Sequence, residues 1–161
     1  MQTPTTAPLR HAFTLVEVMI VVVIIGVLAA IVVPRFGSVT SDAKDSAGQS
    51  ALGGVRAGIA GYRAQQILTG ASPYPTAAQI ETVGTVLQNS VPSNPWNGIA
   101  CVQSVGSAQA ASRTVSNPQS YGWNYYVDNS AKPPVAVFYA NSTNETGVSD
   151  GAGGFKTANQ L

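Results

Sequence analysis

The strongest constraint on this chain is a run of sixteen apolar residues at positions 18–33, with a carboxylate, Glu17, directly before it. As a helix, the 21 residues from Phe13 to Val33 would extend ~32 Å, enough to cross the hydrocarbon core of a bilayer. Twelve of the sixteen are Val, Ile or Leu, and together they favour insertion by roughly 4 to 7 kcal/mol. An acid costs about 2.5 to 3.5 kcal/mol at the centre of such a helix and less near its end. The helix therefore inserts despite Glu17, and an ionised acid in this position usually marks a function.

An ordinary secretory signal peptide is the alternative interpretation of this run. Arg10 would supply its charged region, residues 18–27 its apolar core, and residues 29–30 a cleavage site. However, the run is longer than the ~7–15 residues of such a core, and Glu17 would have no purpose at its start. The chain also continues through residues 31–33 without a polar break. The sequence therefore favours a membrane helix that the mature chain keeps.

The residues around Glu17 resemble the prepilin signature of type IV pilins and type II secretion pseudopilins. That signature is a short polar leader, a small residue that is normally Gly, then Phe-Thr-Leu-x-Glu and an apolar helix. The matching residues are Ala12, Phe13, Thr14, Leu15 and Glu17, with Gly26 and Pro34 where the family commonly has a Gly and a helix-kinking Pro. Ala12 replaces the usual Gly, a departure that bears on the efficiency of cleavage. The resemblance covers roughly residues 8 to 65 and is most specific at its N-terminal end.

The resemblance implies a processing step and an assembly role. An inner-membrane prepilin peptidase would cut between Ala12 and Phe13, and the new amine of Phe13 would then be N-methylated. Glu17 would face the interior of a filament and compensate the positive N-terminus of a neighbouring subunit, which would set the register between subunits. The alternative is that Glu17 snorkels to the membrane interface and has no such role.

The predicted organisation has four parts. They are a cleaved leader (1–12), a transmembrane and filament-core helix (13–34), an amphipathic continuation of that helix (35–68) and an extracytoplasmic globular domain (69–161). Kinking or flexibility is expected at Gly26 and Pro34. Basic residues flank both ends of the span, so charge does not fix its orientation. The resemblance implies a single pass through a bacterial inner membrane, with the C-terminal domain in the periplasm.

An apolar stripe at spacings of three and four predicts that residues 36–62 form an amphipathic helix packed on the globular domain. Its members are Phe36, Val39, Ala43, Ala47, Ala51, Val55, Ile59 and Tyr62. The residues expected off the stripe are Asp42, Lys44, Asp45 and Gln49. Several glycines, Gly48 among them, weaken this helix by up to ~1 kcal/mol each relative to Ala. They allow either close packing or bending.

Beyond residue 69 the patterns predict a short helix followed by strands. Thr76-x-x-Gln79 is a capping box that opens a helix with Ile80, Val83 and Leu87 on one face. Strands are predicted at residues 99–105, 121–127 and 135–140, forming an antiparallel sheet of three or four strands laid on the long helix. The fold class is therefore α+β and pilin-like. Residues 141–161 are expected to be a polar, mobile tail.

Two details of the globular domain bear on function. Tyr121, Trp123, Tyr125 and Val127 alternate along one strand, a pattern that favours core packing against the helix over a sugar-binding platform. The element Pro95-Trp96-Asn97-Gly98 is similar to a Pro-Trp-x-Gly element of pseudopilin globular domains.

Catalytic chemistry is not expected. His11 is the only histidine and lies in the predicted leader, which excludes Ser-His-Asp, Cys-His and zinc arrangements in the mature chain. Charged residues make up 9% of the chain and the net charge is +1, so no nucleic acid partner is expected. The single cysteine, Cys101, cannot form an intrachain disulfide and is expected to be a buried free thiol.

No cofactor is expected, and calcium is the one metal considered, because many major pseudopilins carry a calcium site in their C-terminal loops. Oxygen ligands could come from Asp128, Asn141, Asn144, Glu145 and Asp150. These residues are scattered along the chain, and solvated polar loops are the alternative interpretation.

The resemblance implies a pseudopilin that polymerises into the periplasmic pseudopilus of a type II secretion system. Its expected partners are further copies of itself, other pseudopilins, the prepilin peptidase and N-methyltransferase, the membrane, and an inner-membrane assembly platform with a cytoplasmic ATPase. One alternative is a type IV pilin for adhesion, motility or DNA uptake. The lack of a C-terminal cysteine pair and the Pro-Trp-x-Gly element favour secretion over that alternative. Another is a membrane-anchored extracytoplasmic binding protein.

Overall fold

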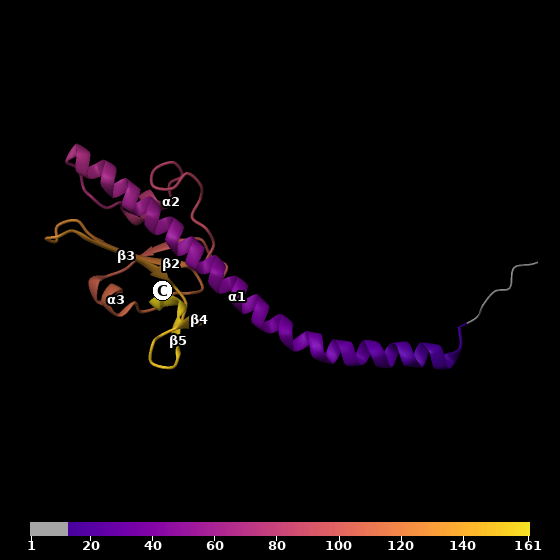
Figure 1. Cartoon of the computed structure of the whole chain (residues 1–161). Coiled ribbons are helices and arrows are strands. Elements are labelled where there is room, and N and C mark those ends of the chain that lie inside the picture. Colours follow the sequence, from indigo (N-terminus) through magenta and orange to yellow (C-terminus); the bar gives the residue numbers. More distant parts are fainter. Residues whose placement is uncertain (1–12) are drawn as a thin grey trace, which may run out of the picture. The chain divides into compact units, whose positions relative to one another are not determined.

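The computed structural model describes residues 13–161, apart from the side chains of residues 33–38. Its elements in chain order are α1 (Leu15–Thr69), α2 (Ala77–Glu81), β1 (Val102–Ser104), α3 (Ser107–Ser112), β2 (Trp123–Asp128), β3 (Val135–Ala140), β4 (Glu145–Ser149), β5 (Phe155–Thr157) and the short 3₁₀ helix η1 (Ala158–Gln160) (Figure 1). The chain forms two compact units, of which the first ends at Val39 and the second runs from Thr40 to Leu161. The α+β class predicted from the sequence is confirmed.

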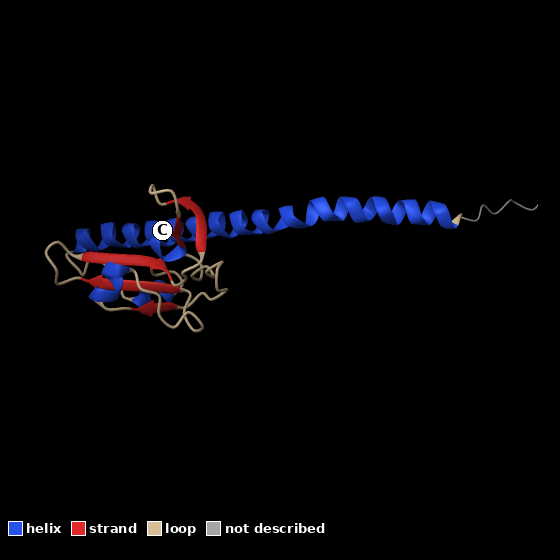
Figure 2. Cartoon of the chain, turned by 90° about the horizontal axis from the view of Figure 1, so that it is seen from below, coloured by secondary structure: helices blue, strands red, loops and turns tan. Residues whose placement is uncertain are grey.

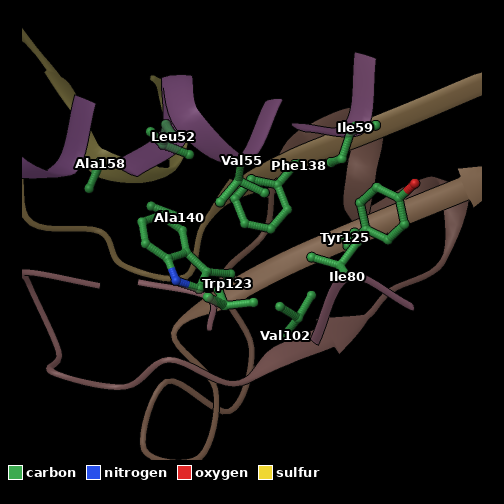
Figure 3. Packing of buried hydrophobic residues seen from close by; sticks show 11 residues of the cluster. Leu52, Val55, Ile59, Ile80, Val102, Trp123, Tyr125, Phe138, Ala140 and Ala158 are labelled. Carbon is green, nitrogen blue, oxygen red and sulfur yellow. The ribbon is translucent and has the colours of Figure 1, made fainter. Parts of the chain in front are cut away.

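The core of the second unit lies between α1 and a three-stranded sheet, with the strands beside the C-terminal half of the helix (Figure 2). Leu52, Val55 and Ile59 supply the helix side of this core. Trp123 and Tyr125 of β2 face them with no exposed surface (Figure 3). The ring of Trp123 stacks on that of Phe138 in β3 at 5.4 Å between centroids. The prediction that this face is core is therefore confirmed for Trp123, Tyr125 and the partly buried Val127, whereas Tyr121 precedes the strand and is not part of the core cluster.

The sheet has the order β1-β2-β3 and is mixed rather than purely antiparallel. β2 and β3 pair antiparallel, with Trp123 opposite Ala140. β1 pairs parallel to β2, with Val102 opposite Trp123. The prediction that β1 is antiparallel to its neighbour was wrong. The chain between β1 and β2 does not turn straight back but crosses over, as a parallel pair of strands requires. The crossover carries α3, and Ala110 of α3 packs with Tyr139 of β3 in a second, smaller core cluster.

The buried face of α1 differs from the predicted apolar stripe between residues 43 and 52. Val55 and Ile59 are buried as expected, but Ala43 and Ala47 are exposed. Asp45, Gly48 and Leu52 are buried in their place. The face is therefore displaced by one or two positions, because a polar contact made by Asp45 and a close ring contact at Gly48 decide which residues face inward.

The capping box at the start of α2 is present. Thr76 Oγ1 accepts from the Gln79 amide at 3.3 Å, and Gln79 Oε1 accepts from the Thr76 amide at 2.8 Å. The helix is shorter than expected, however, and ends at Glu81. Ile80 is buried, whereas Val83 is 58% exposed. Of the predicted apolar face, Ile80 is buried in the helix, and Leu87 packs partly buried against the main core from beyond the helix end.

Residues 141–161 are an integral part of the fold and not a mobile tail. They form the antiparallel pair β4-β5 and η1, and Ala158 belongs to the main core. The Asn159 amide donates to the Ser142 carbonyl at 3.0 Å, and the Asn159 side chain donates to the Arg113 carbonyl at 2.7 Å. The polar composition was misleading because these groups are satisfied by hydrogen bonds inside the fold.

Cys101 is a free thiol, as expected, but it is exposed and not buried. It directly precedes β1, whose first residue, Val102, faces the core. Because neighbouring side chains of an extended chain point to opposite sides, Cys101 faces away from that core.

Candidate functional site

The N-terminal segment of the first unit carries the residues singled out by the sequence. Phe13 precedes the helix and is 80% exposed. Ala12 and the remainder of the predicted leader lie outside the described residues. Cleavage between Ala12 and Phe13, and methylation of Phe13, therefore stay predictions.

Thr14 caps the first turn of α1. Its side-chain oxygen Oγ1 accepts from the Glu17 amide at 3.2 Å, and its carbonyl accepts from the Val18 amide at 3.3 Å. A threonine in this position satisfies one of the amides that a helix leaves unpaired at its start. The sequence interpretation missed this contact, although the Thr-x-x-Glu spacing is that of a capping box and signals it.

Glu17 lies in the first turn of α1, where a negative charge interacts favourably with the helix dipole. Its position is thus compatible with helix formation before any partner is present. The side chain is exposed and has no ion-pair partner among the described residues. A carboxylate in this position is available to a group outside the single chain.

The helix that follows Glu17 is apolar and uncovered. The window Leu15–Val32 has a mean hydropathy of 3.1, and none of its residues is buried in the structure. Its length and composition are those of a single membrane span. A Cβ added at Gly26 would meet no atom within 4 Å. α1 continues through Pro34, and kinking or flexibility at Gly26 and Pro34 stays a prediction.

In the second unit, the Pro-Trp-x-Gly element contacts α1 through a hydrogen bond from Trp96. Trp96 Nε1 donates to Asp45 Oδ1 at 3.2 Å, and the Gly147 amide donates to Asp45 Oδ2 at 2.6 Å. Asp45 is only 5% exposed, and these two bonds compensate its burial. The carboxylate therefore connects the helix to the loop at Trp96 and to β4, both distant in sequence, a contact that the sequence interpretation missed.

The five candidate calcium ligands are not gathered into one site. Asp128 is the last residue of β2, where its Oδ1 accepts from the Ser130 amide and hydroxyl at 2.9 and 2.6 Å. Asp150 lies between β4 and β5, where its Oδ1 accepts from the amides of Ala152 and Gly154 at 2.7 and 2.9 Å.

Hydrogen bonds of this kind lower the pKa of both carboxyl groups, chiefly the bonds from Ser130 to Asp128 and from Ala152 to Asp150. In turns, an aspartate side chain accepts hydrogen bonds from backbone amides a few residues ahead, and this role accounts for an aspartate at both positions.

Of the other three candidates, two form hydrogen bonds within the fold and one is exposed. Asn141 is fully buried, and its Oδ1 accepts from the Ser116 amide and from the side chain of Asn124. Asn144 Oδ1 accepts from the Ser142 hydroxyl at 3.1 Å, and Glu145 is exposed in β4. Across residues 13–161 the structure brings together no group of three or more His, Cys, Asp or Glu side chains that suits a metal ion.

Residues 8–33 match the family described as "Prokaryotic N-terminal methylation motif". No curated protein and no solved structure matches the chain. The matched segment ends where the apolar run ends and includes Ala12, Phe13 and Glu17. It supports a type IV pilin-like protein that is anchored in the membrane by a single span.

Proposed function

We propose that this chain is a structural subunit, a pseudopilin that polymerises into the periplasmic pseudopilus of a type II secretion system. The observation that carries the proposal is the methylation motif at residues 8–33, which overlaps the apolar segment Leu15–Val32 of α1, none of whose residues is buried. A surface of this size is not stable in water and needs lipid or neighbouring helices to cover it. A filament subunit meets both environments in turn, since its helix leaves the membrane to pack against copies of itself.

The partners follow from this cycle. The prepilin peptidase and N-methyltransferase act on residues 12 and 13, and the inner-membrane platform with its cytoplasmic ATPase drives assembly. Other copies of the chain and other pseudopilins then surround the helix. On this proposal Gly26 and Pro34 allow the helix to adapt between lipid and filament, because one lacks a side chain and the other lacks an amide donor. No enzymatic step and no nucleic acid partner is assigned to the chain.

Processing is tested by intact-mass and N-terminal analysis of the chain isolated from its own membrane. We expect a mature protein that begins at Phe13 and carries one methyl group on its terminal amine. Ala12→Gly serves as the matched variant and should be processed at least as fast, because it restores the residue that the signature normally has. A mature chain that begins near Ile31 would instead identify an ordinary signal peptide and end the proposal.

Secretion is favoured over a pilus by the Pro-Trp-x-Gly element, which in this structure joins α1 to the rest of the second unit through Trp96 and Asp45. Deletion of the gene should leave exported proteins trapped in the periplasm, and expression of the wild-type chain should restore their release. A deletion strain that secretes normally but loses surface pili, motility or DNA uptake would favour the type IV pilin alternative. A strain with neither defect would favour a membrane-anchored binding protein.

A further inference from the structure

A cavity of about 340 Å³ lies in the second unit, and residues of α1, β2 and β3 line it together with Tyr74 and the end of α3. Three arginines line it: Arg56 and Arg63 from α1, and Arg113 from the end of α3. Among the described residues no carboxylate lines this cavity. Ile59, Tyr125 and Phe138 form part of its wall (Figure 3). The cavity therefore combines three positive charges with apolar and aromatic walls.

Two of the arginines bond to backbone oxygens. Arg56 donates from Nε and Nη2 to the Phe138 carbonyl at 3.2 and 2.9 Å, and from Nη2 to the backbone oxygen of Leu161 at 3.1 Å. Arg113 Nη1 donates to the Gln160 carbonyl at 2.7 Å. These contacts fix the two guanidinium groups. Burial, and then repulsion from Arg113, lower the pKa of Arg56.

Arg63 is held in place but has free donors. Its guanidinium carbon lies 4.9 Å from the ring centroid of Tyr74, at the distance of a cation–π contact. Its Nε is buried and has no hydrogen-bond partner. A buried charged donor without an acceptor is unfavourable. The structure thus contains a positioned guanidinium that lacks the acceptor its geometry suits.

The tyrosine that lines the cavity does not provide the missing negative charge. Tyr125 donates its hydroxyl proton to the Pro75 carbonyl at 2.9 Å. Burial raises the pKa of this hydroxyl well above its usual range, so Tyr125 stays neutral. Among the described residues, no Asp or Glu side chain lines the cavity beside the three cations.

We propose that this cavity binds a small anion, a carboxylate or phosphate group attached to a compact apolar body, with Arg63 as the principal contact. Guanidinium groups bind both kinds of oxyanion through paired N–H donors. The apolar body would contact Ile59, Tyr74 and Phe138, which line the same cavity. The volume is at the lower end of the range found for small-molecule sites. The inference is independent of filament assembly and of residues 13–39.

Calorimetric titration of the full-length chain in a nonionic detergent tests the proposal. The probes are inorganic phosphate, benzoate and phenyl phosphate, with benzyl alcohol as the neutral probe and protein-free micelles as the blank. We expect phenyl phosphate to bind more tightly than inorganic phosphate, and benzyl alcohol not to bind above the blank. Benzoate and phenyl phosphate separate the carboxylate from the phosphate source. If none of the three anions binds above the blank, the proposal is wrong.

Charge variants then locate the site. Arg63→Gln should weaken phenyl phosphate binding by about tenfold or more, since a charged hydrogen bond is lost, and Arg63→Lys should be intermediate. Lys44→Gln is the matched control, because it removes one positive charge from an exposed position of the same helix. Circular dichroism establishes that each variant is folded, and Arg63→Lys keeps the test valid if Arg63→Gln is not. Equal binding by wild type and Arg63 variants would overturn the assignment.

Discussion

Gly48→Ala should destabilise the second unit by about 2 to 4 kcal/mol, although alanine is the better helix former. A Cβ at position 48 would overlap Cη2 of Trp96 and lie 2.6 and 2.7 Å from its Cζ3 and Cζ2. These are ring atoms, so the whole indole must move to relieve the clash. Because Trp96 Nε1 donates to Asp45 at 3.2 Å, the movement also weakens the hydrogen bond to a buried carboxylate. Urea unfolding of the full-length chain in detergent, followed by circular dichroism, measures the loss.

Gly53→Ala is the matched control, since it makes the same change in the same helix. A Cβ at Gly53 would meet nothing within 4 Å, and the residue is exposed. We therefore expect a stabilisation of about 0.5 to 1 kcal/mol from helix propensity alone. In a Trp96→Ala background most of the cost of Gly48→Ala should disappear, because the clashing ring is gone. If the two glycine variants have the same effect, the close contact between helix and indole is not present in solution.

The features that the sequence predicted well are local ones. The capping box at Thr76 needs residues only three positions apart, and the alternation of Trp123 and Tyr125 is a property of one strand. The apolar span is equally local, since hydropathy over 18 residues defines it. In each of these cases the forces that decide the structure act between residues that are neighbours in the chain.

The failures come from contacts between distant residues. Asp45 has the character of a surface residue, but its burial depends on Trp96 and Gly147, which are 51 and 102 positions away. Those contacts displace the buried face of α1, so a helical period alone does not specify it. The parallel direction of β1 has the same origin, because it depends on where the crossover returns and not on the composition of the strand.

The same distinction between local and distant contacts applies to the candidate sites. The signature around Glu17 is continuous in sequence, and so the family match at residues 8–33 agrees with it. The basic cavity was not anticipated, because Arg56, Arg63 and Arg113 come together only through the packing of α1 against the sheet and the end of α3. A cluster of three arginines drawn from two elements has no sequence signature.

Glu17→Gln should abolish filament assembly and leave membrane insertion and processing intact. Removing the charge lowers the cost of inserting the helix, so the span remains favourable. In a filament core, however, the positive N-terminus of a neighbouring subunit would lose its partner, and an unpaired buried charge costs about 3 to 5 kcal/mol. Every subunit carries the same defect, so the loss repeats along the filament. Carbonate extraction and N-terminal mass analysis report insertion and processing, and electron microscopy of sheared fractions reports filaments.

Three further variants distinguish charge pairing from other roles of the first turn. Thr14→Val removes the cap on the Glu17 amide and should weaken the helix start by about 0.5 to 2 kcal/mol, with filaments still forming. Glu145→Gln removes an exposed carboxylate from β4 and should assemble normally. Glu17→Asp keeps the charge on a shorter side chain and should retain partial assembly. Filaments of normal length and number from Glu17→Gln would contradict the pairing, and the interpretation that Glu17 only snorkels to the membrane surface would then hold.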